Sequence, residues 1–88
     1  MSRKRMELAA VFAALGDETR LTLLAALRDN DSMSIALLTG GTKLSRQAVT
    51  KHLRVLEDAG IVCSKADGKE RLFSLQPHVL EGAKAYFE

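Results

Sequence analysis

The chain has 88 residues, a net charge of +2 and a single cysteine. This length predicts one domain, residues 1–88, with a modest core, and one cysteine excludes a disulfide within the chain. No apolar stretch reaches the roughly 18 residues of a membrane span, and no set of nucleophile, base and acid indicates an enzyme, so we expect a cytoplasmic binding protein.

The first segment with a clear period is residues 6–15, an Ala/Leu-rich helix that ends at Gly16. Its apolar residues have the i, i+3, i+4, i+7 spacing of one helix face. They are Leu8, Val11, Phe12 and Leu15. The preceding basic run, residues 3–5, is either a frayed arm or a contact to the DNA backbone.

A second helix follows, capped by Asp17 or Thr19 and running through Leu27. Its predicted apolar face consists of Leu21, Leu24 and Leu27, with Leu23 at the edge. After a polar turn, Ser32 or Ser34 caps a short third helix from Ile35 to about Thr39. Gly40 and Gly41 are expected to destabilise its C-terminal end, because glycine is unfavourable in helix interiors and common just after them.

The most informative segment is an amphipathic helix that starts after Ser45, its predicted N-cap, and stops at Gly60. At 100° per residue, its apolar side chains form one narrow stripe: Val49, Leu53 and Leu56. Another group of side chains lies on the opposite side: Gln47, Thr50, Lys51 and Arg54. Residues 43–54 contain four basic side chains and no acid. Since Gln pairs with adenine and Arg with guanine, this helix is suited to a major groove.

After Gly60 the pattern changes to two β-prone segments, residues 61–65 and 71–75, joined through Asp67-Gly68. Asp-Gly is a strong hairpin signal. The predicted hairpin carries Lys65, Lys69 and Arg71, cations that can meet DNA phosphates beside the preceding helix.

Pro77 is suited to the first turn of a closing helix that runs to the C-terminus. The first and last helices each offer more apolar surface than a small core needs, so we expect them to form a dimer interface. The predicted interface residues are Leu8, Val11, Phe12, Leu15, Val79, Ala83, Tyr86 and Phe87.

The predicted fold is therefore mainly α with a two-stranded β-wing. The element order is helix, helix, helix, helix, strand, strand, helix. A short helix, a turn, a basic helix and a cationic hairpin together predict a winged helix-turn-helix.

The chain resembles the arsenic-repressor (ArsR-type) family of bacterial and archaeal transcription regulators. The matching segments are residues 12–21, 44–53, 56–62 and 68–75. The resemblance implies a homodimer that binds an imperfect inverted repeat in double-stranded promoter DNA and represses until an inducer lowers its affinity. The family's DNA contacts correspond to Ser45, Arg46, Gln47, Thr50, Lys51 and Arg54, and we add Lys43, Lys69 and Arg71 to the predicted contact set.

The chain departs from the metal-sensing members of that family. Ser34 and Ala36 occupy the positions of their thiolate pair, and neither is a soft-metal ligand. At the family's other site, His78 matches one ligand while Gln76 replaces an aspartate. Because one imidazole with Glu81 nearby supplies too few ligands for zinc, we expect no metal and no cofactor.

Three further residues, Lys43, His52 and Cys63, have predicted roles in the fold. The turn position that is usually glycine in this family is Lys43, so either Gly41 makes a left-handed turn or Lys43 tolerates a strained backbone. His52 lies toward the apolar side of its helix and is predicted to be structural. Cys63, on a strand, fits a small core residue better than a redox sensor.

These features favour a DNA-binding transcriptional repressor. The alternative is a winged-helix module for protein–protein contact, which needs no basic groove-facing residues.

Overall fold

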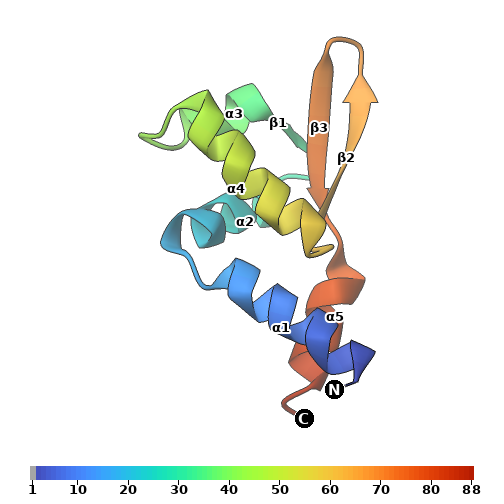
Figure 1. The fold of residues 1–88 in the computed structure, drawn as a ribbon. Helices are drawn as coiled ribbons and strands as arrows, with labels where there is room; N and C mark the ends of the chain where they lie inside the picture. The colour runs from blue at the N-terminus through green and yellow to red at the C-terminus, as the bar shows by residue number, and fades with distance from the viewer. Residues whose placement is uncertain (1) are drawn as a thin grey trace.

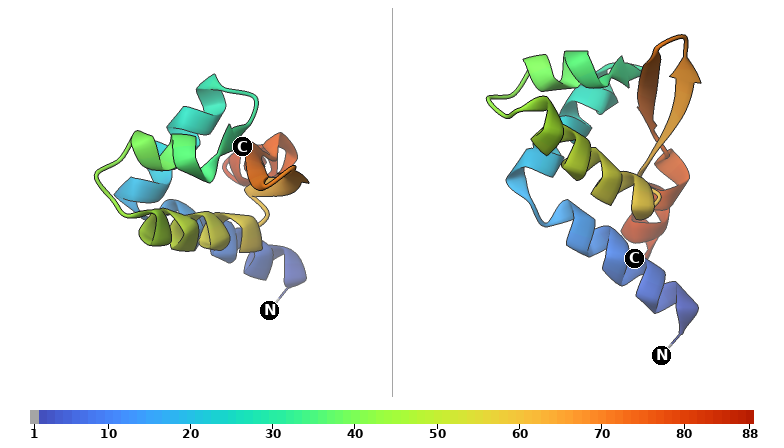
Figure 2. Two further views of the ribbon diagram at one scale, coloured as in Figure 1. Left: turned by 90° about the horizontal axis from the view of Figure 1, so that it is seen from above. Right: turned by 45° about the horizontal axis from the view of Figure 1, so that its top comes forward.

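The computed structural model describes residues 2–88, which form five helices and three strands (Figure 1). Met1, the first residue of the predicted domain, lies outside the described residues. The elements are α1 (Arg3–Leu15), α2 (Glu18–Asp29), β1 (Met33–Ser34), α3 (Ile35–Gly40), α4 (Arg46–Asp58), β2 (Val62–Asp67), β3 (Glu70–Leu75) and α5 (Pro77–Ala85). The β2–β3 hairpin, here called the wing, projects at one end, while α1 and α5 lie at the other (Figures 1 and 2).

The core is built around the apolar stripe of α4. Val49, Leu53 and Leu56 are essentially inaccessible to solvent, as predicted. They belong to one cluster with buried residues of every other helix, of the sheet and of the turn before β2: Val11, Ala14, Leu23, Leu27, Leu38, Ile61, Val62, Phe73 and Ala83. Each fully buried Leu or Val contributes about 1.5–3 kcal/mol. The stripe is therefore the main attachment of α4 to the fold.

The apolar face of α2 differs from the predicted one. Leu23 and Leu27 are buried, whereas Leu21 is 51% exposed and Leu24 only half-buried. Four leucines cover a wide arc of this helix, and the neighbouring elements enclose only the side centred on Leu23 and Leu27. The spacing of leucines in the sequence shows which arc of α2 is apolar, but not which part of that arc is buried.

The sheet has three strands rather than the predicted two. Its order is β1-β3-β2, with all neighbours antiparallel. The additional strand is the two-residue β1, in which Met33 pairs with Phe73 and Ser34 with Leu72. A strand this short shows no alternation in the sequence, so the predicted element order lacked it. The wing itself closes with Asp67 opposite Glu70. Its two-residue turn therefore begins at Gly68, with φ +62°.

Two helix caps settle alternatives that the sequence left open, and a third confirms the predicted cap of α4. Asp17 caps α2 by accepting from the backbone N–H of Arg20, at 3.0 Å. Ser34 caps α3 in the same manner, and Ser45 caps α4 through the N–H of Ala48 at 3.1 Å. Each bond satisfies a donor that the first helical turn leaves unpaired.

The turn between α3 and α4 contains no left-handed residue, so both alternatives predicted for it were wrong. Gly41 has φ −88°, and within residues 2–88 only Gly60 and Gly68 have positive φ. The chain turns instead through Thr42, whose side chain donates to the Thr39 carbonyl and accepts from the Leu44 N–H. Hydroxyl hydrogen bonds thus replace the glycine conformation.

The two ends of the chain also differ in detail from prediction. Ser2 caps α1, so residues 3–5 form its first turn rather than a frayed arm. That turn lies beside α5, away from the start of α4 (Figure 1). At the other end, Pro77 opens α5 as predicted, but the helix stops at Ala85 instead of reaching the C-terminus. Within residues 2–88 no helix is long and apolar enough to cross a membrane.

Gly60 ends α4 in a Schellman motif. The Ile61 N–H donates to the Leu56 carbonyl at 3.0 Å and the Gly60 N–H to that of Glu57 at 2.9 Å. Gly60 has φ +79°, and a Cβ there would stand 3.6 Å from Val79 Cγ2, an ordinary contact. Backbone strain is therefore the main cost of any side chain at this position.

We expect Gly60→Ala to lower the free energy of unfolding by about 1–2 kcal/mol, the cost of a left-handed non-glycine residue. Urea denaturation measures it. The matched control is Gly40→Ala, since Gly40 has negative φ and open space around its Cα. That control should be neutral or slightly stabilising, and equal losses in both variants would contradict the assignment of strain to Gly60.

The cap on α2 predicts an effect of pH. The hydrogen bond from the Arg20 N–H lowers the pKa of Asp17 below its ordinary value. The resulting stabilisation is present above the ordinary pKa and disappears as pH falls through the lowered one. Asp17→Asn should therefore destabilise the protein at neutral pH, with a deficit that shrinks on acidification. Asp31→Asn, at an exposed site outside any helix, should show no such trend in urea denaturation across the same pH series. A constant deficit in Asp17→Asn would contradict the prediction.

Candidate nucleic-acid interface

The polar side of α4 is an open surface opposite the buried stripe. Arg46, Gln47, Lys51 and Arg54 are exposed, Thr50 is half-buried, and the five together line one shallow depression. Ser45 and Lys43 are exposed immediately before the helix. Three cations, an amide and a hydroxyl on this helix match the donors and acceptors on base edges and phosphates.

The order of charges along α4 opposes the helix dipole. The first turn contains no acid and begins with Arg46, while Glu57 and Asp58 occupy the last turn, which has no base. A favourable arrangement is the reverse, with each well-placed charge contributing about 0.3–1 kcal/mol. This helix thus carries an unfavourable charge order within itself. The same order produces a positive N-terminal end, which suits a polyanion.

Hydrogen bonds within α4 determine what its hydroxyls can offer a ligand. The Ser45 Oγ accepts from the Ala48 N–H, so its own proton is available for a phosphate oxygen. The Thr50 Oγ1 donates to the Arg46 carbonyl at 2.8 Å. Thr50 therefore presents oxygen lone pairs and a methyl group. These suit the amino groups of adenine or cytosine and the methyl group of thymine.

The wing holds its cations in two different ways. Lys69 is exposed in the turn, and Lys65 is exposed on β2. Arg71 instead donates to the Ser64 Oγ at 3.1 Å, and that hydroxyl donates to Glu57 at 2.6 Å. This series of two hydrogen bonds joins the wing to the acidic end of α4. Arg71 therefore has a fixed direction relative to the helix, whereas Lys69 can follow a phosphate backbone.

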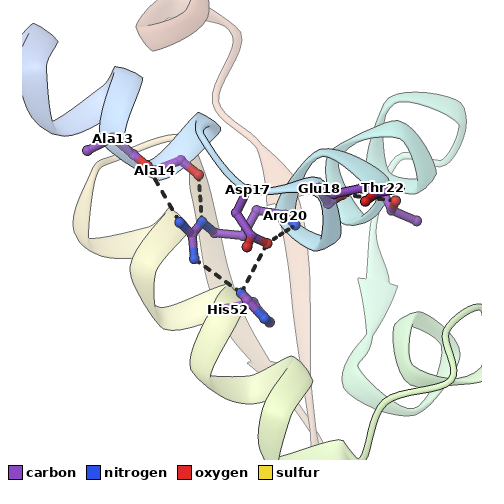
Figure 3. Close-up of polar contacts among 7 residues, drawn as sticks. All are labelled: Ala13, Ala14, Asp17, Glu18, Arg20, Thr22 and His52. Atoms are coloured by element: carbon purple, nitrogen blue, oxygen red, sulfur yellow. Dashed lines mark hydrogen bonds and ion pairs between the residues drawn. The ribbon is translucent and has the colours of Figure 1, made fainter.

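Arg20 is a residue to which the sequence assigned no role. Its Nε donates to the Ala14 carbonyl at 2.6 Å and its Nη2 to that of Ala13 at 3.5 Å (Figure 3). Its Nη1 lies 3.2 Å from His52 Nδ1. His52 Nδ1 in turn lies 3.7 Å from Asp17 Oδ2. His52 thus contacts scaffold residues, in keeping with its predicted structural role. Both Arg20 and His52 stand in segments shared with the resembled family, a signal that marks each residue separately but not the contact between them.

The predicted dimer residues divide into two groups. Val11 and Ala83 lie in the core, and Leu8, Leu15 and Val79 are partly buried against it. Phe12, Tyr86 and Phe87 are 36%, 56% and 75% exposed. Their rings meet edge to face, with centroids 5.4–6.3 Å apart. We call these three residues the aromatic patch. Large exposed aromatic groups of this kind mark interaction surfaces.

The positions related to metal sensing are occupied as follows. Ser34 is buried at the start of α3, Ala36 is exposed, and His78 is exposed at the start of α5. Among residues 2–88 no three His, Cys, Asp or Glu side chains gather closely enough to hold a metal ion. Cys63 is half-buried, with its Sγ 3.5 Å from the Ser74 Oγ.

Comparison with known proteins agrees with this geometry. A model of the family described as winged helix-turn-helix DNA-binding matches residues 16–62. An uncharacterized HTH-type transcriptional regulator, YuzN of Bacillus subtilis, is 42% identical over 77% of this chain and 83% of its own length. The arsenical resistance operon repressor of Escherichia coli is 28% identical over 78% of this chain and 59% of its own.

A solved structure gives the same result for the fold. The ArsR-like transcriptional regulator from Rhodococcus sp. RHA1 superposes with a TM-score of 0.83 at 37% identity, covering 93% of this chain and 76% of that one. The α4 surface, the wing and these similarities lead to one conclusion. The chain belongs to the winged helix-turn-helix DNA-binding family and is a transcriptional regulator of the ArsR type.

Proposed function

We propose that the protein is a homodimeric repressor that binds an inverted-repeat operator in double-stranded promoter DNA. The observation that carries this proposal is the polar surface of α4, which retains its basic N-terminal end despite the unfavourable order of charges along the helix. In this proposal Gln47, Thr50 and Arg54 face the base edges. Ser45, Arg46 and Lys51, with Lys43 before the helix and Lys69 and Arg71 on the wing, contact phosphates or neighbouring bases.

The repressor role is supported by the name of the E. coli relative, an operon repressor. The family is one of regulators, and we propose that this protein acts by binding DNA without catalysing a reaction. Its place of action would be the cytoplasm of a bacterial or archaeal cell, where promoter DNA is accessible.

Dimerisation is supported by the aromatic patch. The patch joins α1 to the residues that follow α5, and both segments lie at the end of the molecule away from the wing (Figure 1). A two-fold axis through this end leaves both α4 helices free. It would also place them one DNA turn apart, about 34 Å. A dimer doubles the phosphate contacts, so its affinity should fall steeply with salt.

Selection of bound duplexes from a random DNA pool would give the operator, and three variants test the contacts. We expect Arg46→Ala, Gln47→Ala and Arg54→Ala each to weaken binding to the selected operator by about ten- to a hundred-fold, the worth of one base contact of roughly 1–3 kcal/mol. Fluorescence anisotropy at fixed salt measures this.

The matched control is Arg28→Ala, which removes the same charge from an exposed position at the end of α2. It should leave affinity nearly unchanged. If all three α4 variants bind as tightly as the wild type, the DNA contacts are misassigned. Failure of the wild type to select any sequence would favour the alternative, a protein–protein interaction module.

The dimer is tested separately. Phe87→Ser should shift the protein from dimer to monomer in sedimentation-equilibrium experiments, because it removes the most exposed ring of the aromatic patch. The control is Leu37→Ser, a similarly exposed apolar residue on α3, at 64% exposure. Dissociation of both variants, or of neither, would rule out the aromatic patch as the interface.

A further inference from the structure

Arg20 joins three helices through one side chain. It stands in the first turn of α2, and its guanidinium bonds to the last carbonyls of α1 and to His52 in the middle of α4 (Figure 3). Capping α1 requires only the bonds to Ala13 and Ala14. The contact with His52 is additional and connects the end of α1 to the DNA-facing helix.

The chemistry of the contact defines which atom of His52 faces Arg20. A guanidinium has donors and no acceptor, so the 3.2 Å contact requires a lone pair on His52 Nδ1. Nδ1 is therefore the atom through which His52 meets the guanidinium. Asp17 Oδ2, at 3.7 Å from Nδ1, is the nearby anion on the same side. The ring of His52 thus has one defined orientation against α2.

The contacts of Arg20 with α1 and α4 lie next to the two surfaces proposed for dimerisation and DNA binding. On α1, the acceptors Ala13 and Ala14 directly follow Phe12, a member of the aromatic patch. On α4, His52 stands between Lys51, on the polar surface, and the buried Leu53. A short path therefore runs from the proposed dimer interface through Arg20 and His52 to the proposed DNA contacts.

Apolar packing alone does not define this geometry. Val11 and Ala14 of α1 pack in the same core cluster as Val49 and Leu53 of α4. Such packing is non-directional and tolerates small rotations or sliding of a helix. Hydrogen bonds from a planar guanidinium have narrow angular requirements. The polar link is therefore the part of the contact that fixes how α4 is turned relative to α1.

We propose that Arg20 and His52 are positioning residues that set which half-site spacing the dimer accepts. In a symmetric dimer any displacement of α4 relative to α1 occurs in both protomers, so it changes the distance between the two DNA-facing helices twice over. This inference rests on the proposed function, a homodimer on an inverted repeat.

The test uses a set of duplexes in which the selected half-sites are kept and their separation is changed one base pair at a time. The wild type should prefer one separation. His52→Ala should lose about ten-fold in affinity at that separation, the worth of one hydrogen bond to a charged group, and much less at its neighbours. His52→Asn supplies an acceptor near the position of Nδ1 and should restore the preference. Arg20→Lys, which keeps the charge without the fork, should behave like His52→Ala.

Several outcomes separate this inference from its alternatives. A uniform loss across all separations in His52→Ala, or no loss, would overturn the positioning role, as would a wild type without any preference. Sedimentation equilibrium and urea denaturation of each variant check that dimer and fold persist. If His52→Ala does not fold, Arg20→Lys and His52→Asn decide the question. Wild-type protein that binds none of the duplexes would overturn the proposed function itself, and the inference with it.

Discussion

Burial of the Val49, Leu53 and Leu56 stripe is the constraint on which the rest of the structure depends. These side chains are the centre of a core contributed by every element of a small domain except the two-residue β1. Because they occupy one side of α4, the opposite side must face solvent. Packing of the core does not restrict the residues on that side, so they can serve contact with a ligand. One face of α4 therefore packs in the core, and the opposite face is available for function.

That arrangement explains why α4 can carry an unfavourable order of charges. A basic first turn and an acidic last turn each oppose the helix dipole at a cost below about 1 kcal/mol per charge. Burial of three large apolar side chains offsets such a cost several times over. The Schellman motif at Gly60 and the Ser45 cap add hydrogen bonds at the two ends. Local rules are relaxed here because tertiary packing supplies the stability, as is common at functional sites.

The sequence predicted those parts of the fold that depend on strong local signals. The stripe of α4, its Ser45 cap and the two wing strands have clear periods or preferred residues, and all three are confirmed. It missed β1, since two residues show no period. It also centred the face of α2 on the wrong leucines, because that choice depends on which neighbours cover the helix. The α3–α4 turn was missed for a related reason: hydroxyl bonds from Thr42 replaced the glycine that the family pattern suggested.

The site shows the same division between local and long-range information. Exposure of Arg46, Gln47 and Arg54 follows from the helical period alone, so the candidate DNA contacts could be named without a structure. Arg20 and His52 are 32 positions apart, and no periodicity relates them. Only the fold brings the end of α1 and the back of α4 within reach of one guanidinium. A residue that connects two surfaces has no pattern of its own in the sequence, because its bonding partners are set by the tertiary packing of the helices and not by helical spacing.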